Sequence, residues 1–126
     1  MRVVTVLVPL PMFYNPDEAG HRQPIEDGKF TLTAEEIARR FGGGTLWRFP
    51  EGVAPRGYWW NRGILNTDIL AMLEVDVPDT RENRNWLQQY AAEVLIERFE
   101  QEVIYLKFYG GVAASATITV SKRSPG

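Results

Sequence analysis

A chain of 126 residues has the usual size of one domain, and 44% hydrophobic with 24% charged residues is an ordinary globular composition, which argues against disorder. The absence of cysteine excludes disulfides, thiolate metal sites and cysteine nucleophiles, and it suits a reducing cytoplasm. The formal net charge of −2 lacks the basic excess typical of nucleic-acid binders. We therefore expect one cytoplasmic domain over residues 1–126, in which any binding of nucleic acid would need a local basic patch.

The first predicted strand lies near the start of the chain, where the residues from Val3 to Val8 are mostly β-branched and two prolines end the run. This apolar run is too short to cross a membrane, and no small-residue cleavage site follows it, so neither a membrane segment nor a signal peptide is expected. Residues 11–31 then form a long connection rich in turn residues. A segment of about 20 irregular residues in a compact domain is commonly a lid or a binding loop.

A short helix is predicted after this connection. The sequence Thr33-Ala34-Glu35-Glu36 is typical of a capping box, with Thr33 at the start of the helix. Ile37 and Phe41 follow at helical spacing, and Gly42-Gly43-Gly44 ends the helix. Because these glycines follow a helix, they indicate a C-cap; a phosphate-binding loop would precede one.

The middle of the chain is rich in aromatic residues. Residues 45–49 and 57–61 lie on either side of Pro50-Glu51-Gly52, and they predict either the two strands of a hairpin or one long irregular strand. Residues 62–67 are expected to form a loop. The alternation of apolar and polar residues up to Val77 then predicts a half-buried strand over residues 69–77.

A second helix and a last strand complete the pattern. Asp79-Thr80-Arg81-Glu82 is another capping signature, and a broad apolar stripe from Trp86 to Phe99 follows it at helical spacing. Residues 103–108 form the last clear strand. Residues 115–121, within the terminal segment 110–126, predict either a short edge strand or part of a tail.

The order of these elements predicts an α+β fold, a ferredoxin-like βαββαβ sandwich. Its antiparallel sheet has the spatial order 4-1-3-2 with two helices on one face, because the crossovers must be right-handed. An extra hairpin and a C-terminal edge strand are compatible additions.

Side-chain parity divides the strand residues between the two faces of the sheet. The helices are expected to cover Val4, Val6, Val8, Leu73, Val75, Val77, Ile104, Leu106 and Phe108. The other face, here called the open face, is expected to carry Thr5, Leu7, Glu74, Asp76, Tyr105 and Lys107. Such a mixed face is not left bare in a two-layer domain. We expect residues 11–31 or a second copy of the chain to cover it, and we favour a homodimer.

The candidates for catalysis are few. Glu74 and Asp76 stand two residues apart on one strand, so their side chains point the same way about 7 Å apart, a spacing that suits Mg²⁺ binding or acid–base work. A solvated or salt-bridged strand face is the alternative, because no third metal ligand accompanies them; neither a metal nor a cofactor is expected. His21, the only histidine, lies in the 11–31 loop and is either a general base or an ordinary surface residue. Tyr105 completes the catalytic candidates.

Aromatic and cationic residues alternate between Trp47 and Arg62. This composition is typical of single-stranded nucleic-acid binding and equally of protein interfaces. Because the net charge is negative, a protein or a small molecule is the expected partner. The candidate ligand- or partner-binding residues of this region, the loop and the open face are Tyr14, Asn15, His21, Arg22, Trp47, Arg48, Trp59, Trp60, Arg62 and Lys107.

The second half of the chain resembles a family of small bacterial domains of uncharacterised function. The resemblance covers residues 41–108 and depends on Arg48-Phe49-Pro50-Glu51-Gly52, Gly57-Tyr58-Trp59, Tyr90 and the run from Arg98 to Val103. It implies a ferredoxin-like sheet and assigns no reaction and no catalytic residue.

Three functions are compatible with these observations. The leading hypothesis is a homo-oligomeric binding or accessory domain that uses the open face and the 11–31 loop. The first alternative is a small enzyme in which the loop closes over Glu74, Asp76 and Tyr105, with His21 assisting. The second is a single-stranded nucleic-acid binder that uses residues 47–62.

Overall fold

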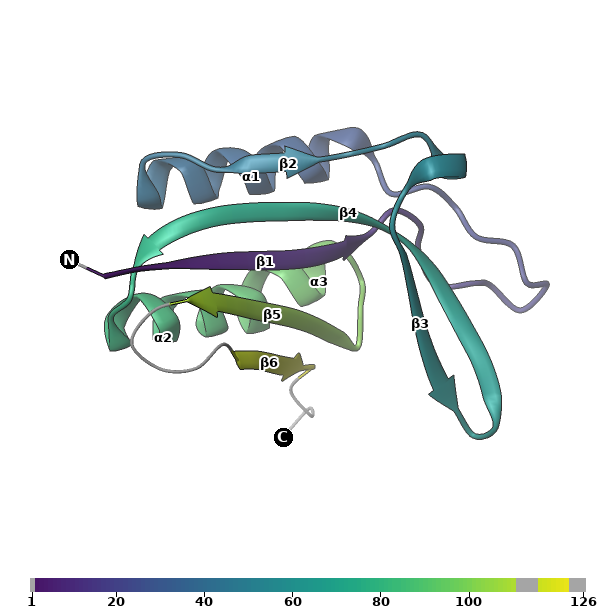
Figure 1. Ribbon diagram of the computed structural model, residues 1–126. Coiled ribbons are helices and arrows are strands. Elements are labelled where there is room, and N and C mark those ends of the chain that lie inside the picture. Colours follow the sequence, from purple (N-terminus) through teal and green to yellow (C-terminus); the bar gives the residue numbers. More distant parts are fainter. Residues whose placement is uncertain (1, 111–115, 123–126) are drawn as a thin grey trace.

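The computed structural model, which describes residues 2–110 and 116–122, is an α+β sandwich with one six-stranded antiparallel sheet. Both helices lie behind the sheet in the view of Figure 1. The elements in chain order are β1 (Val3–Pro11), α1 (Asp27–Phe41), β2 (Thr45–Trp47), a 3₁₀ turn (Glu51–Val53), β3 (Arg56–Asn61), β4 (Ile64–Pro78), α2 (Arg81–Tyr90), a π-helical stretch (Ala91–Leu95), α3 (Ile96–Arg98), β5 (Val103–Gly110) and β6 (Ala116–Ser121).

The sheet has the strand order β2-β4-β1-β5-β6, and β3 pairs with the first half of β4. The run β5-β1-β4-β2 is the 4-1-3-2 order of a ferredoxin-like sandwich, so the predicted fold class is confirmed. The strand β6 extends the sheet beyond β5, which decides between the two predictions for residues 115–121 in favour of an edge strand. Residues 111–115 and 123–126 lie outside the described residues.

Both predictions for residues 45–49 and 57–61, a hairpin and one long irregular strand, are wrong, since β2 and β3 are separate strands that each pair with β4. The predicted loop at residues 62–67 is wrong too, because only Arg62 and Gly63 form the turn, with φ angles of 52° and 80°. Two consecutive residues with positive φ make the tight turn that suits the twist of a β-hairpin. β4 therefore starts at Ile64, five residues earlier than the alternation indicated.

The first helix also starts earlier than its sequence signature. α1 begins at Asp27, and Thr33 is fully buried inside the helix, where its Oγ1 donates to the backbone oxygen of Lys29 at 2.7 Å. The predicted capping box is wrong because Phe30 belongs to the core and extends the apolar side of the helix by more than a turn. The end of the helix is as predicted: Gly42 has φ 89°, and its N–H donates to the oxygen of Ala38.

The second capping signature is confirmed with a shift of one residue. Thr80 is the N-cap of α2, and its side chain accepts a hydrogen bond from the N–H of Asn83 at 3.1 Å.

No helix in the described part of the chain has both the length and the apolar character needed to cross a membrane.

The core lies between the sheet and the helices, as parity predicted. All nine strand residues assigned to the helix side are at most 3% exposed. Phe30 of α1 and Phe99, next to α3, meet edge to face in the same core with ring centroids 5.2 Å apart.

A buried polar network joins α1 to the second helical segment. The Nη1 of Arg98 donates to Thr33 at 2.8 Å and to Glu36 at 2.6 Å, and the hydroxyl of Tyr90 donates to the same carboxylate at 2.7 Å. The hydrogen bond from Arg98 lowers the pKa of Glu36, and burial raises the pKa of Tyr90. The network fixes the two helices relative to one another on the side of the sheet opposite the open face.

Candidate functional site

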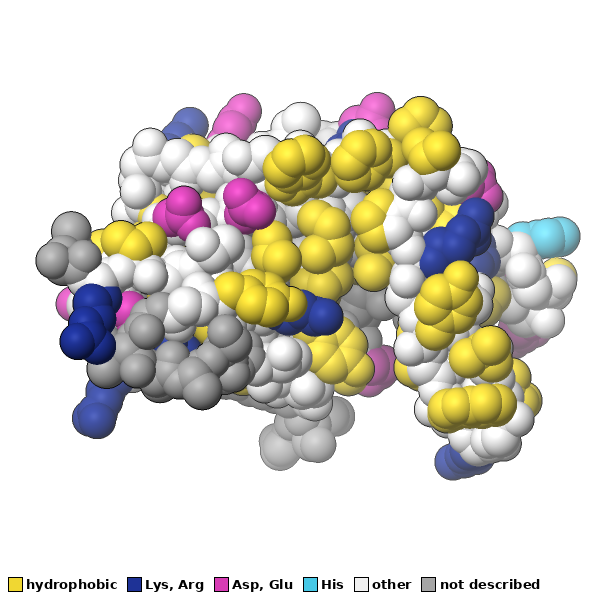
Figure 2. Space-filling model, in the orientation of Figure 1, with side chains coloured by type: hydrophobic (Ala, Val, Ile, Leu, Met, Phe, Trp, Pro, Cys, Tyr) yellow, Lys and Arg dark blue, Asp and Glu magenta, His cyan; other side chains and the backbone are white. Residues whose placement is uncertain are grey.

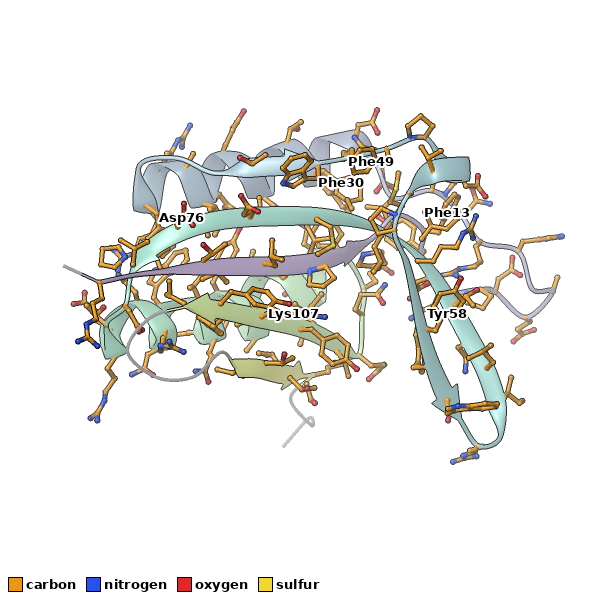
Figure 3. The ribbon with its side chains drawn as sticks, viewed as in Figure 1. Phe13, Phe30, Phe49, Tyr58, Asp76 and Lys107 are labelled. Atoms are coloured by element: carbon orange, nitrogen blue, oxygen red, sulfur yellow. The ribbon has the colours of Figure 1, made fainter. Side chains whose placement is uncertain are left out.

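The strand register arranges the open face in three rows of side chains. The first row is Tyr109, Thr5 and Asp76; the second is Lys107, Leu7, Glu74 and Thr45; the third has Met72 between Pro9 and Trp47. Directly opposed residues in an antiparallel sheet are about 5 Å apart, so each row is one contiguous strip of surface. Figure 3 shows Asp76 and Lys107 on this face.

Glu74 and Asp76 form one end of the open face, which we call the acidic end. The hydroxyl of Thr5 donates to Asp76 Oδ1 at 2.6 Å, which orients that carboxylate. Lys107 is separated from Glu74 by the whole width of β1, and no cation among the described residues lies within ion-pair distance of either carboxylate. Within the described residues, Glu74 and Asp76 therefore do not form the salt bridges of the alternative interpretation.

A hollow of about 330 Å³ opens beside the acidic end. Its lining is made by the residues around the end of α1 and by β4, namely Phe41, Gly42, Gly43, Gly44, Thr45, Glu74, Val75 and Asp76. Gly44 approaches the backbone of Glu74 so closely that a Cβ there would stand 3.4 Å from its oxygen. The three glycines that end the helix thus also border the two carboxylates with bare backbone.

No His, Cys, Asp or Glu of the described residues joins the pair in a group of three or more that could hold a metal ion. Two carboxylates without a further ligand are a poor site for Mg²⁺, which prefers several oxygen ligands in a fixed geometry. Two unpaired carboxylates do suit an organic cation, for which hydrogen-bonding geometry is less demanding than coordination.

The part of the open face farthest from the acidic end is apolar. Pro9, Trp47, Met72 and Tyr105 form the part that we call the apolar half, and Trp47 and Tyr105 are 45% and 44% exposed. Phe49 stacks on Trp47 with ring centroids 6.3 Å apart. Figure 2 shows hydrophobic side chains gathered between the acidic residues and the β3–β4 hairpin.

The strand β3 and the first part of β4 form a two-stranded arm, residues 56–69, which projects from the sandwich (Figure 1). Tyr58, Trp60 and Leu65 lie on one side of the arm, because Tyr58 is opposite Thr67 and Trp60 is opposite Leu65. Trp59 lies on the other side. The arm thus displays large apolar side chains on both of its faces.

The candidate binding residues of the 11–31 loop make contacts that hold the loop in place. The hydroxyl of Tyr14 donates to Glu26, and that bond lowers the pKa of Glu26. Arg22 donates to the backbone oxygen of Tyr14 and pairs with Asp68 at the base of the arm. Asn15 reaches the backbone oxygen of Glu100 at 3.5 Å. These contacts hold the loop beyond the C-terminal end of β1 and beside the base of the arm, so it does not cover the open face (Figure 1).

His21 is exposed and has Asp17 as its neighbour, with 3.9 Å between Nδ1 and Oδ2. It lies at the opposite end of the molecule from the acidic end (Figure 2). The structure brings Glu74, Asp76 and Tyr105 to one face, as parity predicted, but it does not bring His21 to them.

The Trp- and Arg-rich region 47–62 is divided between three places. Trp47 lies on the open face, whereas Arg48 pairs with Asp27 at 2.8 Å and stacks over the ring of Phe30. Trp59 and Trp60 lie on opposite sides of the arm, and Arg62 lies in its turn. These residues therefore do not form the single continuous platform that a nucleic-acid strand would need.

Three parts of the site were not expected from the sequence. The lining by Gly42–Thr45 went unnoticed because these glycines already had a role in ending the helix. Tyr109 follows the parity of Tyr105 and Lys107 and would have been found by continuing that strand two residues. The arm had a signal too: Arg62-Gly63 is a turn pair between two apolar runs.

No family model matches the chain, and no curated protein matches it in sequence. The resemblance of residues 41–108 to a small bacterial family therefore stays an expectation. The chain is similar to two solved structures of a phage SAM lyase. The structure in the apo state has a TM-score of 0.55 and 15% identity, covering 99% of this chain and 92% of that chain. The structure in complex with S-methyl-5′-thioadenosine has a TM-score of 0.56 and 16% identity, covering 95% and 88%. At this identity the similarity shows the fold alone.

Proposed function

We propose that this protein binds a cationic nucleoside of the S-adenosylmethionine class at the acidic end of its open face. The observation that carries the proposal is the pair of carboxylates, Glu74 and Asp76, which have no cationic partner among the described residues and border a hollow of about 330 Å³. The similarity to the fold of phage SAM lyase over nearly the whole chain supports this ligand class.

The chemistry of a sulfonium nucleoside fits this surface. The sulfonium sulfur carries a permanent positive charge, and a carboxylate at about 4 Å attracts it with roughly 4 kcal/mol before desolvation is subtracted. The adenine ring is flat and stacks on aromatic side chains; Tyr109, 46% exposed, stands in the same row as Asp76. The backbone along Gly42–Gly44 is open to polar groups of a ribose because no side chain covers it.

The site so defined excludes the 11–31 loop from direct contact with the ligand. Tyr14, Asn15, His21 and Arg22 hold the loop at the other end of the sheet, as described above. The proposed site therefore keeps the open face from the original hypothesis and replaces the loop by the glycine-rich end of α1.

Calorimetry with three ligands tests the proposal. S-adenosylmethionine carries the sulfonium charge, whereas S-adenosylhomocysteine and S-methyl-5′-thioadenosine are neutral at sulfur. We expect the sulfonium compound to bind more tightly than both thioethers. Glu74→Gln and Asp76→Asn should each weaken its binding about tenfold, since one pairing of roughly 1.4 kcal/mol is lost, and should leave the thioethers nearly unaffected.

The matched control is Glu51→Gln, which removes an exposed carboxylate from the 3₁₀ turn, outside the acidic end. Equal binding of the sulfonium and the thioether compounds would refute the proposal. An equal loss in Glu51→Gln would do the same, because it would show a general effect of net charge.

A lyase reaction on S-adenosylmethionine is the second candidate, and the similarity to phage SAM lyase favours it. The bond between the sulfur and the amino-acid side chain breaks as the carboxylate of the same molecule attacks that carbon. The sulfur keeps the electron pair of the broken bond, so neutral S-methyl-5′-thioadenosine and a cyclic ester of the amino acid are released. The acidic end would hold the cation more strongly than this product, which favours product release. Chromatography of S-methyl-5′-thioadenosine formed with and without the protein tests the reaction; equal amounts would leave binding as the function.

A further inference from the structure

The arm, residues 56–69, exposes several large apolar side chains to solvent. Tyr58, Trp60 and Leu65 on one side are 63%, 73% and 52% exposed, and Ile64 at the turn is 66% exposed. An isolated two-stranded hairpin is only marginally stable in water. Clusters of large exposed apolar side chains mark surfaces that bind other molecules.

We propose that the arm docks on the apolar half of the open face of a second copy of this chain. The arm spans six residue pairs, so it is about 20 Å long. The three adjacent strands β4, β1 and β5 span about 15 Å including their flanks. One arm is thus long enough to lie across the apolar half.

The two surfaces match in chemistry. The side of the arm with Tyr58 and Trp60 is aromatic, and the apolar half presents Trp47 and Tyr105, both nearly half exposed. Aromatic residues of this kind are the usual anchors of protein interfaces. The open face has no cover within the described residues, because the 11–31 loop lies beyond the end of β1, beside the base of the arm (Figure 1).

The charges of the two surfaces are opposite. The arm carries Arg56 and Arg62, and its one carboxylate, Asp68, is already paired with Arg22. The open face carries Glu74 and Asp76 against one lysine. A positive arm and a negative face attract one another before contact, which favours their association over arm–arm contact.

The buried area is of the right size for a stable complex. The three large side chains on the docking side of the arm, Tyr58, Trp60 and Leu65, together expose on the order of 400 Å². If two copies exchange arms, each buries its own arm and a similar area of its open face. This gives about 800 Å² per copy, the value of a standard protein interface.

The arm cannot cover the open face of its own chain. β4 runs without interruption from the arm into the sheet, from Ile64 to Pro78, so the arm continues the sheet outward (Figures 1 and 3). An arm that docks on this face therefore comes from another copy.

The first experiment measures mass in solution by light scattering and sedimentation, with no ligand present, so its result is independent of the proposed ligand site. We expect a dimer or a larger closed assembly. The double variant Tyr58→Ser/Trp60→Ser should be a folded monomer with unchanged far-UV circular dichroism. Leu32→Ser removes a large exposed residue from α1 instead, and it should leave the mass unchanged.

The second experiment uses the absence of cysteine in the sequence, so that only introduced thiols can form a disulfide. Leu65→Cys and Tyr105→Cys are purified separately and mixed under oxidising conditions. We expect a cross-linked dimer in the mixture and much less in either variant alone. The result does not depend on how a variant that removes the interface folds.

Two results would overturn the proposal. A wild-type protein that stays a monomer at concentrations up to hundreds of micromolar would exclude the exchange. Efficient cross-linking of Leu65→Cys with itself, without cross-linking in the mixture, would show arm–arm contact instead.

Discussion

Arg98 joins α1 to the second helical segment, so its removal should lower the stability of the fold measurably. Its guanidinium donates to Thr33 and Glu36, and its side chain is only 14% exposed. In Arg98→Met the carboxylate of Glu36 keeps one donor, the hydroxyl of Tyr90. Breaking a buried pair costs about 3–5 kcal/mol. Because the side chain of Glu36 is 35% exposed and partly hydrated, we reduce this to about 2–3 kcal/mol.

Urea denaturation followed by circular dichroism measures this loss. With a urea dependence of about 1–3 kcal/mol per molar, the midpoint should fall by about 0.7–3 M. Arg81→Met, at an exposed position in the first turn of α2, is the control and should change the midpoint little. A fall below about 0.3 M in Arg98→Met would refute the reasoning, since it would mean that water replaces Arg98 at no cost.

The pH dependence gives a second readout of the same network. Arg98 lowers the pKa of Glu36 in the folded protein, so the unfolded chain binds the proton more readily. The stabilisation is therefore complete above the ordinary pKa of glutamate and is lost as the pH falls through the lowered value. Wild-type stability should decrease more steeply on acidification than that of Arg98→Met. Parallel pH profiles would contradict this account of Glu36.

The remaining predictions concern the base of the arm and the end of α1. Arg22→Ala leaves the carboxylate of Asp68, which is 12% exposed, without its ion-pair partner. The free energy of unfolding should fall by about 2–3 kcal/mol, and proteolysis in the 11–31 loop should become faster. Adding Asp68→Asn should restore much of the lost stability. Gly42→Ala should cost about 1 kcal/mol in thermal unfolding, because φ is 89° there, whereas Gly43→Ala, in open space without positive φ, should cost almost nothing; equal losses would contradict the backbone explanation.

The two-layer fold could be predicted from the sequence because three strands alternate cleanly. Parity assigned residues such as Val6, Leu73 and Leu106 to the core, and each is buried. Alternation is a property of the strand itself and needs no knowledge of its neighbours. For the same reason Glu74 and Asp76 could be assigned to one face.

The errors occurred where long-range packing overrides local signals. The capping pattern at Thr33 is locally sound, yet Phe30 gains more by entering the core than the helix gains from that cap. The strand pairing of β3 depends on a two-residue turn at Arg62 and Gly63, in which glycine is expected but an arginine with positive φ is uncommon. Both errors shortened an element that tertiary contacts extend.

The contacts between residues of the candidate site could not be predicted from the sequence. Asp76 could be placed on the open face, but its partner Thr5 comes from 71 residues away and is fixed only by the register of β1 against β4. The same register sets Glu74 beside Thr45 and brings the glycines after α1 to the acidic end. A glycine run that ends a helix can therefore also open the backbone beside two carboxylates, so one structural role does not exclude a second. Binding measurements on Gly44→Ala would probe the second role, because its Cβ would stand 3.4 Å from the backbone oxygen of Glu74 while the left-handed cap at Gly42 stays intact.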